Sequence, residues 1–129
     1  MQRSYRLIGI AILAAAAAAQ SPVQMAPAKF ANRTNPYEGS ETASMAGAKL
    51  FARECAACHG ANGEGLEKAP SLRRPEVSNA TPGALFWVLE NGSLRNGMPS
   101  FAHLPAPQRW QIVTFLRTLS STARPAPGP

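Results

Sequence analysis

The chain has 129 residues, with 13 basic and 7 acidic side chains and a formal net charge of +6. This length favours a single domain, and two cysteines are too few for a disulfide framework or a cysteine-rich zinc site. Because the arginines are dispersed along the chain, and because its N-terminal pattern, described next, predicts export, we expect no nucleic-acid partner. Most of the basic excess lies in residues 68–129. It fits an acidic docking partner, or a solvated basic surface without one.

Residues 1–19 have the pattern of a secretory signal peptide. Arg3 and Arg6 precede an uncharged apolar run, residues 7–19, that ends in small side chains before Gln20. This run is shorter than the about 20 residues that cross a membrane. We therefore expect export to a bacterial periplasm and no membrane span after cleavage. An uncleaved N-terminal anchor, which would keep the protein membrane-associated, is the alternative.

Residues 20–40 are rich in proline, alanine and small polar residues. Pro22, Pro27 and Pro36 favour an extended chain without regular structure. We predict a flexible tether here, disordered except where residues 35–37 could pack back on the domain.

A first long helix is predicted over residues 41–54, where apolar side chains recur at helical spacing. Ser40 or Thr42 could cap its start. Gly47 lies inside the helix, where glycine costs stability relative to alanine. We therefore expect a second helix to cross closely at Gly47.

The next five residues read Cys-Ala-Ala-Cys-His, from Cys55 to His59, which is the attachment motif for c-type haem. Positions i and i+3 share one face of a helical turn, so Cys55 and Cys58 could both form thioether bonds to one porphyrin. His59 would then coordinate the iron from one side. We predict one covalently attached haem c per chain.

A Cys-x-x-Cys pair can also be half of a zinc site or a thioredoxin-like redox pair. Zinc takes about four ligands, whereas the chain has two cysteines and two histidines, His59 and His103, and Cys58 and His59 are adjacent. A thioredoxin-like pair needs flanking strands, and the sequence has no convincing strand pattern. Haem attachment is therefore the preferred interpretation.

Residues 60–65 form a glycine-rich loop, and a turn at Pro70 follows. The lysine and helix start of a phosphate-binding loop do not follow the glycines, so we expect no phosphate site. A metal-bound histidine usually donates its second ring N–H to a carbonyl or carboxylate. The turn around Pro70 could present such a carbonyl to His59.

A second helix is predicted to start at Thr81 as the cap with Pro82 in the first turn, and to end at residues 91–92. Its side chains are apolar on nearly every side, as expected for a helix packed between a haem and the protein. We expect Trp87 to be a core residue, with a hydrogen bond to a haem propionate as the alternative.

Met98 is the candidate sixth ligand of the iron. It lies in a loop bounded by glycine and proline, away from any amphipathic helix face, and such a loop could hold a weak thioether ligand at a fixed distance. A lone methionine is otherwise packing filler. His103 is the rival ligand, but its surroundings resemble the approach to a helix and favour a capping or surface role.

The last helix is predicted over residues 105–119, with a broad apolar stripe and with Arg109 among the residues that face mostly outward. Residues 121–129 are proline-rich and expected to be disordered. Since no strand pattern or repeat is found, we predict an all-α domain over residues 41–120.

Together, these motifs and helices resemble a small class I cytochrome c of the bacterial mono-haem type. The resemblance covers about residues 35–119 and is carried by residues 47–51, 55–60, 69–72, 97–99 and 110–119. It implies three to four helices around the haem, with the first and last helices crossing so that Gly47 and Phe51 meet Phe115 and Leu116. It also implies that the carbonyl of Pro70 orients the iron-bound His59.

The resemblance implies a one-electron carrier rather than an enzyme, since His59 and Met98 would fill both axial positions of the iron. Its redox partners would be a dehydrogenase or quinol-oxidising complex and an oxidase or reductase. A five-coordinate haem enzyme or gas sensor, or a fixed cytochrome subunit of a dehydrogenase complex, are the alternatives. Three arginines could pair with haem propionates or with a partner, or could simply be exposed to solvent: Arg73, Arg74 and Arg95.

Overall fold

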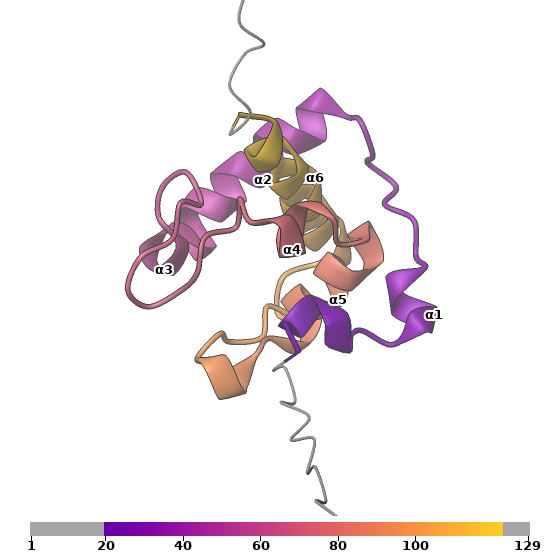
Figure 1. Ribbon diagram of the computed structural model, residues 1–129. Coiled ribbons are helices and arrows are strands. Elements are labelled where there is room, and N and C mark those ends of the chain that lie inside the picture. Colours follow the sequence, from indigo (N-terminus) through magenta and orange to yellow (C-terminus); the bar gives the residue numbers. More distant parts are fainter. Residues whose placement is uncertain (1–19, 123–129) are drawn as a thin grey trace, which may run out of the picture.

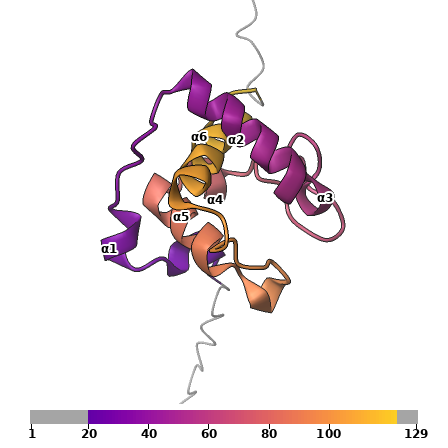
Figure 2. The same ribbon diagram turned by 180° about the vertical axis from the view of Figure 1, so that it is seen from behind.

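The computed structural model describes residues 20–122, and within this range the protein is helical and has no β-strand, only two isolated bridges. Figures 1 and 2 show two long helices that cross, with shorter helices and loops around them. In chain order the elements are η1 (Pro22–Met25), α1 (Ala28–Ala31), α2 (Glu41–Glu54), α3 (Ala56–His59), α4 (Pro75–Ser78), α5 (Pro82–Asn91), η2 (Leu94–Asn96) and α6 (Ala106–Thr122). The predicted all-α class is confirmed.

The crossing of α2 and α6 organises the core. Ser40 caps α2 by accepting a hydrogen bond from the Ala43 N–H at 3.1 Å. A Cβ atom added to Gly47 would lie 2.0 Å from the carbonyl oxygen of Gln111, so only glycine permits this approach. One turn further on, Phe51 packs on Phe115 with ring centroids 5.2 Å apart. The predicted close crossing is confirmed.

Helix α5 packs against α6 and contributes apolar side chains to the core. Thr81 caps it by accepting from the Ala84 N–H at 3.2 Å. Phe86 stacks on Trp110 of α6 with centroids 4.0 Å apart. Trp87, expected in the core, is only half-buried.

The segment 20–40 differs from the expected tether. Its short helices η1 and α1 pack on α5 (Figure 1), and the Phe30 carbonyl approaches so closely that a Cβ atom on Gly83 would collide with it. Asn35 is buried, and its Nδ2 donates to Thr114 Oγ1 at 2.9 Å. Pro22 and Pro27 stand at the starts of η1 and α1, and the half-buried side chain of Val23 in η1 packs against the core. Tyr37 also packs against the core, as the sequence allowed.

The last helix extends further than predicted, because residues 121 and 122 belong to α6 and not to a tail. The predicted signal peptide (residues 1–19) and the rest of the predicted tail (residues 123–129) lie outside the described residues. Among the helices of residues 20–122, none has the length and apolar character needed to cross a membrane.

Candidate haem-binding site

The two cysteines lie on one helical turn, as the spacing predicted. Cys55 ends α2, and its N–H donates to the Phe51 carbonyl at 2.8 Å. Its own carbonyl accepts from the N–H groups of Cys58 and His59, at 3.2 and 3.0 Å. Neither cysteine is in a disulfide; the Cys55 side chain is buried and the Cys58 side chain is exposed. Both thiols are therefore free to form thioether bonds.

The environment of Cys55 suits an uncharged sulfur. Burial, followed by the nearby charges of Glu54 and Cys58, raises the pKa of the Cys55 thiol to about 12. A metal-binding thiolate would have to be charged at this buried position, whereas a thioether carries no charge. No group of three or more His, Cys, Asp or Glu side chains within residues 20–122 could hold a metal ion. The site thus fits thioether attachment better than zinc.

The contact expected between His59 and Pro70 is present, with His59 Nδ1 3.0 Å from the Pro70 carbonyl oxygen. A carbonyl oxygen only accepts hydrogen bonds, so Nδ1 carries the proton in this contact. The lone pair is then on Nε2, which is the atom able to bind iron.

Residues 60–72, the His59 loop, hold the Pro70 carbonyl in place through contacts within the loop. The Gly65 N–H donates to the His59 carbonyl at 2.7 Å, and the Leu72 N–H donates to the Gly63 carbonyl at 2.8 Å. Gly65 has φ +90°, and a Cβ atom there would lie 2.6 Å from the Ser71 nitrogen. The turn that presents Pro70 therefore depends on a glycine at position 65.

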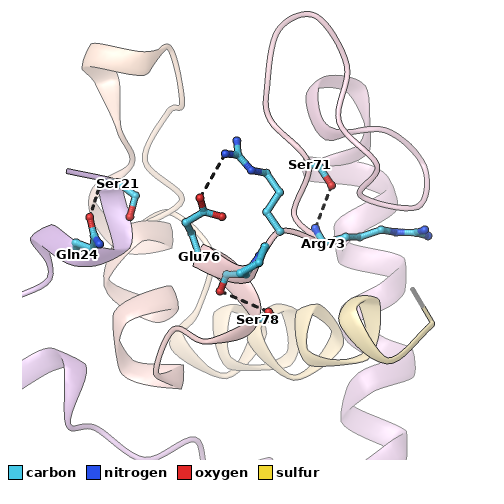
Figure 3. A network of polar contacts seen from close by, with 8 residues as sticks. Ser21, Gln24, Ser71, Arg73, Glu76 and Ser78 are labelled. Atoms are coloured by element: carbon cyan, nitrogen blue, oxygen red, sulfur yellow. Dashed lines mark hydrogen bonds and ion pairs between the residues drawn. The ribbon is translucent and has the colours of Figure 1, made fainter. Parts of the chain in front are cut away.

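Polar side chains brace the His59 loop. The Glu64 carboxylate accepts from the Asn62 N–H at 2.8 Å, and hydrogen bonds from the backbone of Glu64 and Asn62 lower the pKa of Glu64. Arg73 Nε donates to the Asn62 carbonyl at 3.0 Å, and the Arg73 N–H donates to Ser71 Oγ at 3.2 Å (Figure 3). Arg74 Nη2 lies 3.3 Å from Glu76 Oε1. Two of the three arginines considered for propionates thus have contacts within the chain.

Residues 92–104, the Met98 loop, follow α5. The Ser93 N–H donates to the Met98 carbonyl at 2.9 Å, and the Met98 N–H donates to the Ser93 carbonyl at 3.0 Å. The Met98 side chain is half-buried and packs against the core, whereas His103 is exposed. Burial therefore favours Met98 over His103 as an inward-pointing donor.

The two loops extend from the same side of the molecule, to the left in Figure 1 and to the right in Figure 2. Each loop carries an exposed large apolar side chain: Leu66 is 51% exposed and Leu94 is 78% exposed. Two free thiols, an imidazole with Nε2 available and apolar side chains on these two loops together fit a covalently attached haem.

The sequence interpretation missed the residues that hold these loops. Gly65 was recognised only as part of a glycine-rich loop and Gly92 only as part of a helix end, although glycine at a forced turn was a usable signal. Arg109, expected to face outward, is 7% exposed. No pattern in the sequence distinguishes it from Arg117, the other arginine of the last helix.

Comparison with known proteins agrees with this site. Residues 42–116 match the family described as "Cytochrome C oxidase, cbb3-type, subunit III". The chain belongs to the c-type cytochromes. As a member of this family it carries covalently attached haem c, and the expected cytochrome c fold is confirmed.

Named relatives of this cytochrome include the "Alcohol dehydrogenase (quinone), cytochrome c subunit" of Gluconacetobacter polyoxogenes and of Komagataeibacter europaeus. Each is 32% identical over 106 residues, which cover 73% of the cytochrome but only 22% of the relative. The cytochrome thus spans about a fifth of these relatives. The crystal structure of cytochrome cL from the marine methylotroph Methylophaga aminisulfidivorans MPT is similar, with a TM-score of 0.59, 25% identity and coverage of 83% of this chain and 71% of that one.

Proposed function

We propose that this cytochrome is a periplasmic one-electron carrier, and not an enzyme, whose haem is attached through Cys55 and Cys58 and ligated by His59 and Met98. The observation that carries the proposal is the pair of hydrogen bonds between Ser93 and Met98, at 2.9 and 3.0 Å. These backbone bonds close a short loop that ends in a half-buried methionine, which suits a fixed ligand better than packing filler.

When bound, haem c supplies a one-electron Fe(III)/Fe(II) couple. His59 Nδ1 keeps its proton and donates a hydrogen bond to the Pro70 carbonyl oxygen, 3.0 Å away, so electron transfer needs no proton movement at this residue. The uncharged thioether of Met98 favours the ferrous state and raises the reduction potential. Because His59 and Met98 would both be donors to the iron, no position would be left for a substrate.

The experiment that tests this proposal is the Met98→Ala variant of the exported holoprotein. We expect covalent haem to be retained, the far-red Met–iron band of the oxidised spectrum to disappear, the potential to fall and the reduced iron to bind CO. Met45→Ala is the matched control, because Met45 is 61% exposed on α2 and should leave all three readouts unchanged. An unchanged Met98→Ala protein, or a wild-type protein that already binds CO, would favour the five-coordinate enzyme or gas sensor instead.

The similarity to a dehydrogenase cytochrome subunit favours a dehydrogenase as electron donor and makes a fixed subunit the second candidate. A free carrier would pass the electrons on to an oxidase or reductase, or receive them from a quinol-oxidising complex. Purification from the native periplasm under mild conditions distinguishes a free carrier from a fixed subunit. A stoichiometric complex with a dehydrogenase means a subunit, and a cytochrome that elutes alone means a carrier.

A further inference from the structure

Arg109, in the first turn of α6, is a buried cation with contacts to α5 and to the Met98 loop. Its Nε donates to the Leu104 carbonyl at 3.2 Å, and its guanidinium carbon lies 4.6 Å from the centroid of the Phe86 ring. Its Nη1 is 3.3 Å from Glu90 Oε1, within ion-pair distance but without the geometry of a hydrogen bond. Burying a charge is costly unless it is paired, so these contacts define where the guanidinium can lie.

Glu90 connects Arg109 to the Met98 loop. While its carboxylate faces Arg109, its backbone carbonyl accepts a hydrogen bond from Ser100 Oγ. In the preceding residue, the Leu89 carbonyl accepts from the Phe101 N–H at 2.7 Å. The last turn of α5 therefore holds the middle of the loop directly.

The end of the same loop is held by Arg109. Leu104 is the last residue of the loop before α6, and its carbonyl is the acceptor for Arg109 Nε. Since the guanidinium also faces Glu90, a single side chain joins the end of the Met98 loop to the turn of α5 that holds its middle. The segment from Met98 to Leu104 is thus held by α5 at Ser100 and Phe101, and by Arg109 at Leu104.

Such bracing matters for a thioether ligand. Methionine has three rotatable bonds and is a weak donor, so the side chain alone does not fix the distance between its sulfur and an iron. That distance depends on the loop backbone. A loop that opens more often would release the methionine more often.

We propose that Arg109, acting with Glu90, is a positioning residue for Met98 that keeps the Met98 loop closed and so controls how often the methionine leaves the iron. The inference rests on the proposed function, in which Met98 is the axial ligand.

The test is the rate at which imidazole binds the ferric holoprotein in stopped-flow absorbance, because imidazole needs the position that Met98 would occupy. Arg109→Gln should bind imidazole about tenfold faster or more, since a hydrogen bond to a charged group is lost. Glu90→Gln should change the rate in the same direction and by less. This second variant also serves if Arg109→Gln yields no folded protein, because Glu90 is partly exposed.

Arg117→Gln is the matched control. Arg117 lies on the same helix and also donates to backbone carbonyls, those of Ser78 and Ala80, but these belong to the α4 region. Its loss should lower the free energy of unfolding and leave the imidazole rate within roughly twofold of wild type, since distant sites act independently.

Each outcome has a separate meaning. Faster binding in Arg109→Gln and Glu90→Gln, but not in Arg117→Gln, supports the inference. If Arg109→Gln and Arg117→Gln bind at the wild-type rate, or are accelerated equally, Arg109 is only a stabilising residue and the inference is wrong. If wild type already binds imidazole as fast as Met98→Ala, Met98 is not a ligand, and the proposed function fails together with the inference.

Discussion

The His59 loop and the Met98 loop are held in different ways, although both extend from the same side of the molecule (Figure 1). Pro70 is held near His59 by contacts between residues that are close in sequence, such as those of Gly65 and Leu72. The Met98 loop is held by α5 and by Arg109 of α6. The contacts within the His59 loop can form as soon as residues 59–72 fold, whereas the contacts of the Met98 loop with α5 and α6 require the whole helical core. The methionine side should therefore be the more sensitive to distant substitutions.

The largest effect is expected from a substitution that removes one of the two thiols that attach the haem, that of Cys58. Cys58→Ala should lose most of its covalently bound haem, because one of the two thioether bonds can no longer form. The mass of the exported chain and haem staining of the denatured protein measure this loss. Ala57→Ser, at the exposed neighbouring position, should incorporate haem normally. Normal incorporation with two covalent bonds in Cys58→Ala would contradict the attachment argument.

A matched pair of glycine substitutions tests the two loops against each other. Gly65 (φ +90°) lies against Ser71, and Gly92 (φ +69°) lies so close to the Met98 loop that a Cβ atom would be 2.8 Å from the Met98 carbonyl oxygen. Gly65→Ala should displace the Pro70 carbonyl. His59 then becomes a poorer donor, and we expect the potential to rise by about 40 mV, the equivalent of one hydrogen bond.

Gly92→Ala should have the opposite sign. A thioether ligand favours the ferrous state. Displacing the Met98 loop weakens this ligand, so we expect the reduction potential to fall by at least as much as it rises in Gly65→Ala. Redox titration of both holoproteins measures the shifts. If both potentials move in the same direction, the two loops do not act through different ligands as proposed.

The smallest effect concerns the brace within the His59 loop. The folded-state pKa of Glu64 is lowered from its ordinary value of 4.5 by backbone hydrogen bonds, so the ionised carboxylate favours the folded state. Its contribution is complete above pH 4.5 and is lost as the pH falls through the lowered pKa. Glu64→Gln should therefore be slightly less stable than wild type at pH 7, and the difference should shrink in acid. Chemical denaturation at several pH values measures it, and a difference that grows in acid would refute this role.

Features that depend on neighbouring residues could be predicted from the amino-acid sequence alone. The bounds of α2, the caps Ser40 and Thr81, and the single turn that carries Cys55 and Cys58 follow from helical spacing and local hydrogen bonding. Gly47 also predicted the helix crossing, because a glycine inside a long helix lowers its stability and is favoured where another backbone approaches closely.

The way in which distant segments meet was not predictable in this manner and emerged with the packed helices. Within residues 20–40, η1 and α1 pack on α5 instead of forming a tether. The composition of this segment does not reveal that α5 offers it a surface. Arg109 is buried because Glu90, Phe86 and Leu104 come together around it, and these residues are adjacent only after α5 and α6 have packed. Burial and pairing of this kind depend on contacts between elements, which the spacing of residues along one helix does not specify.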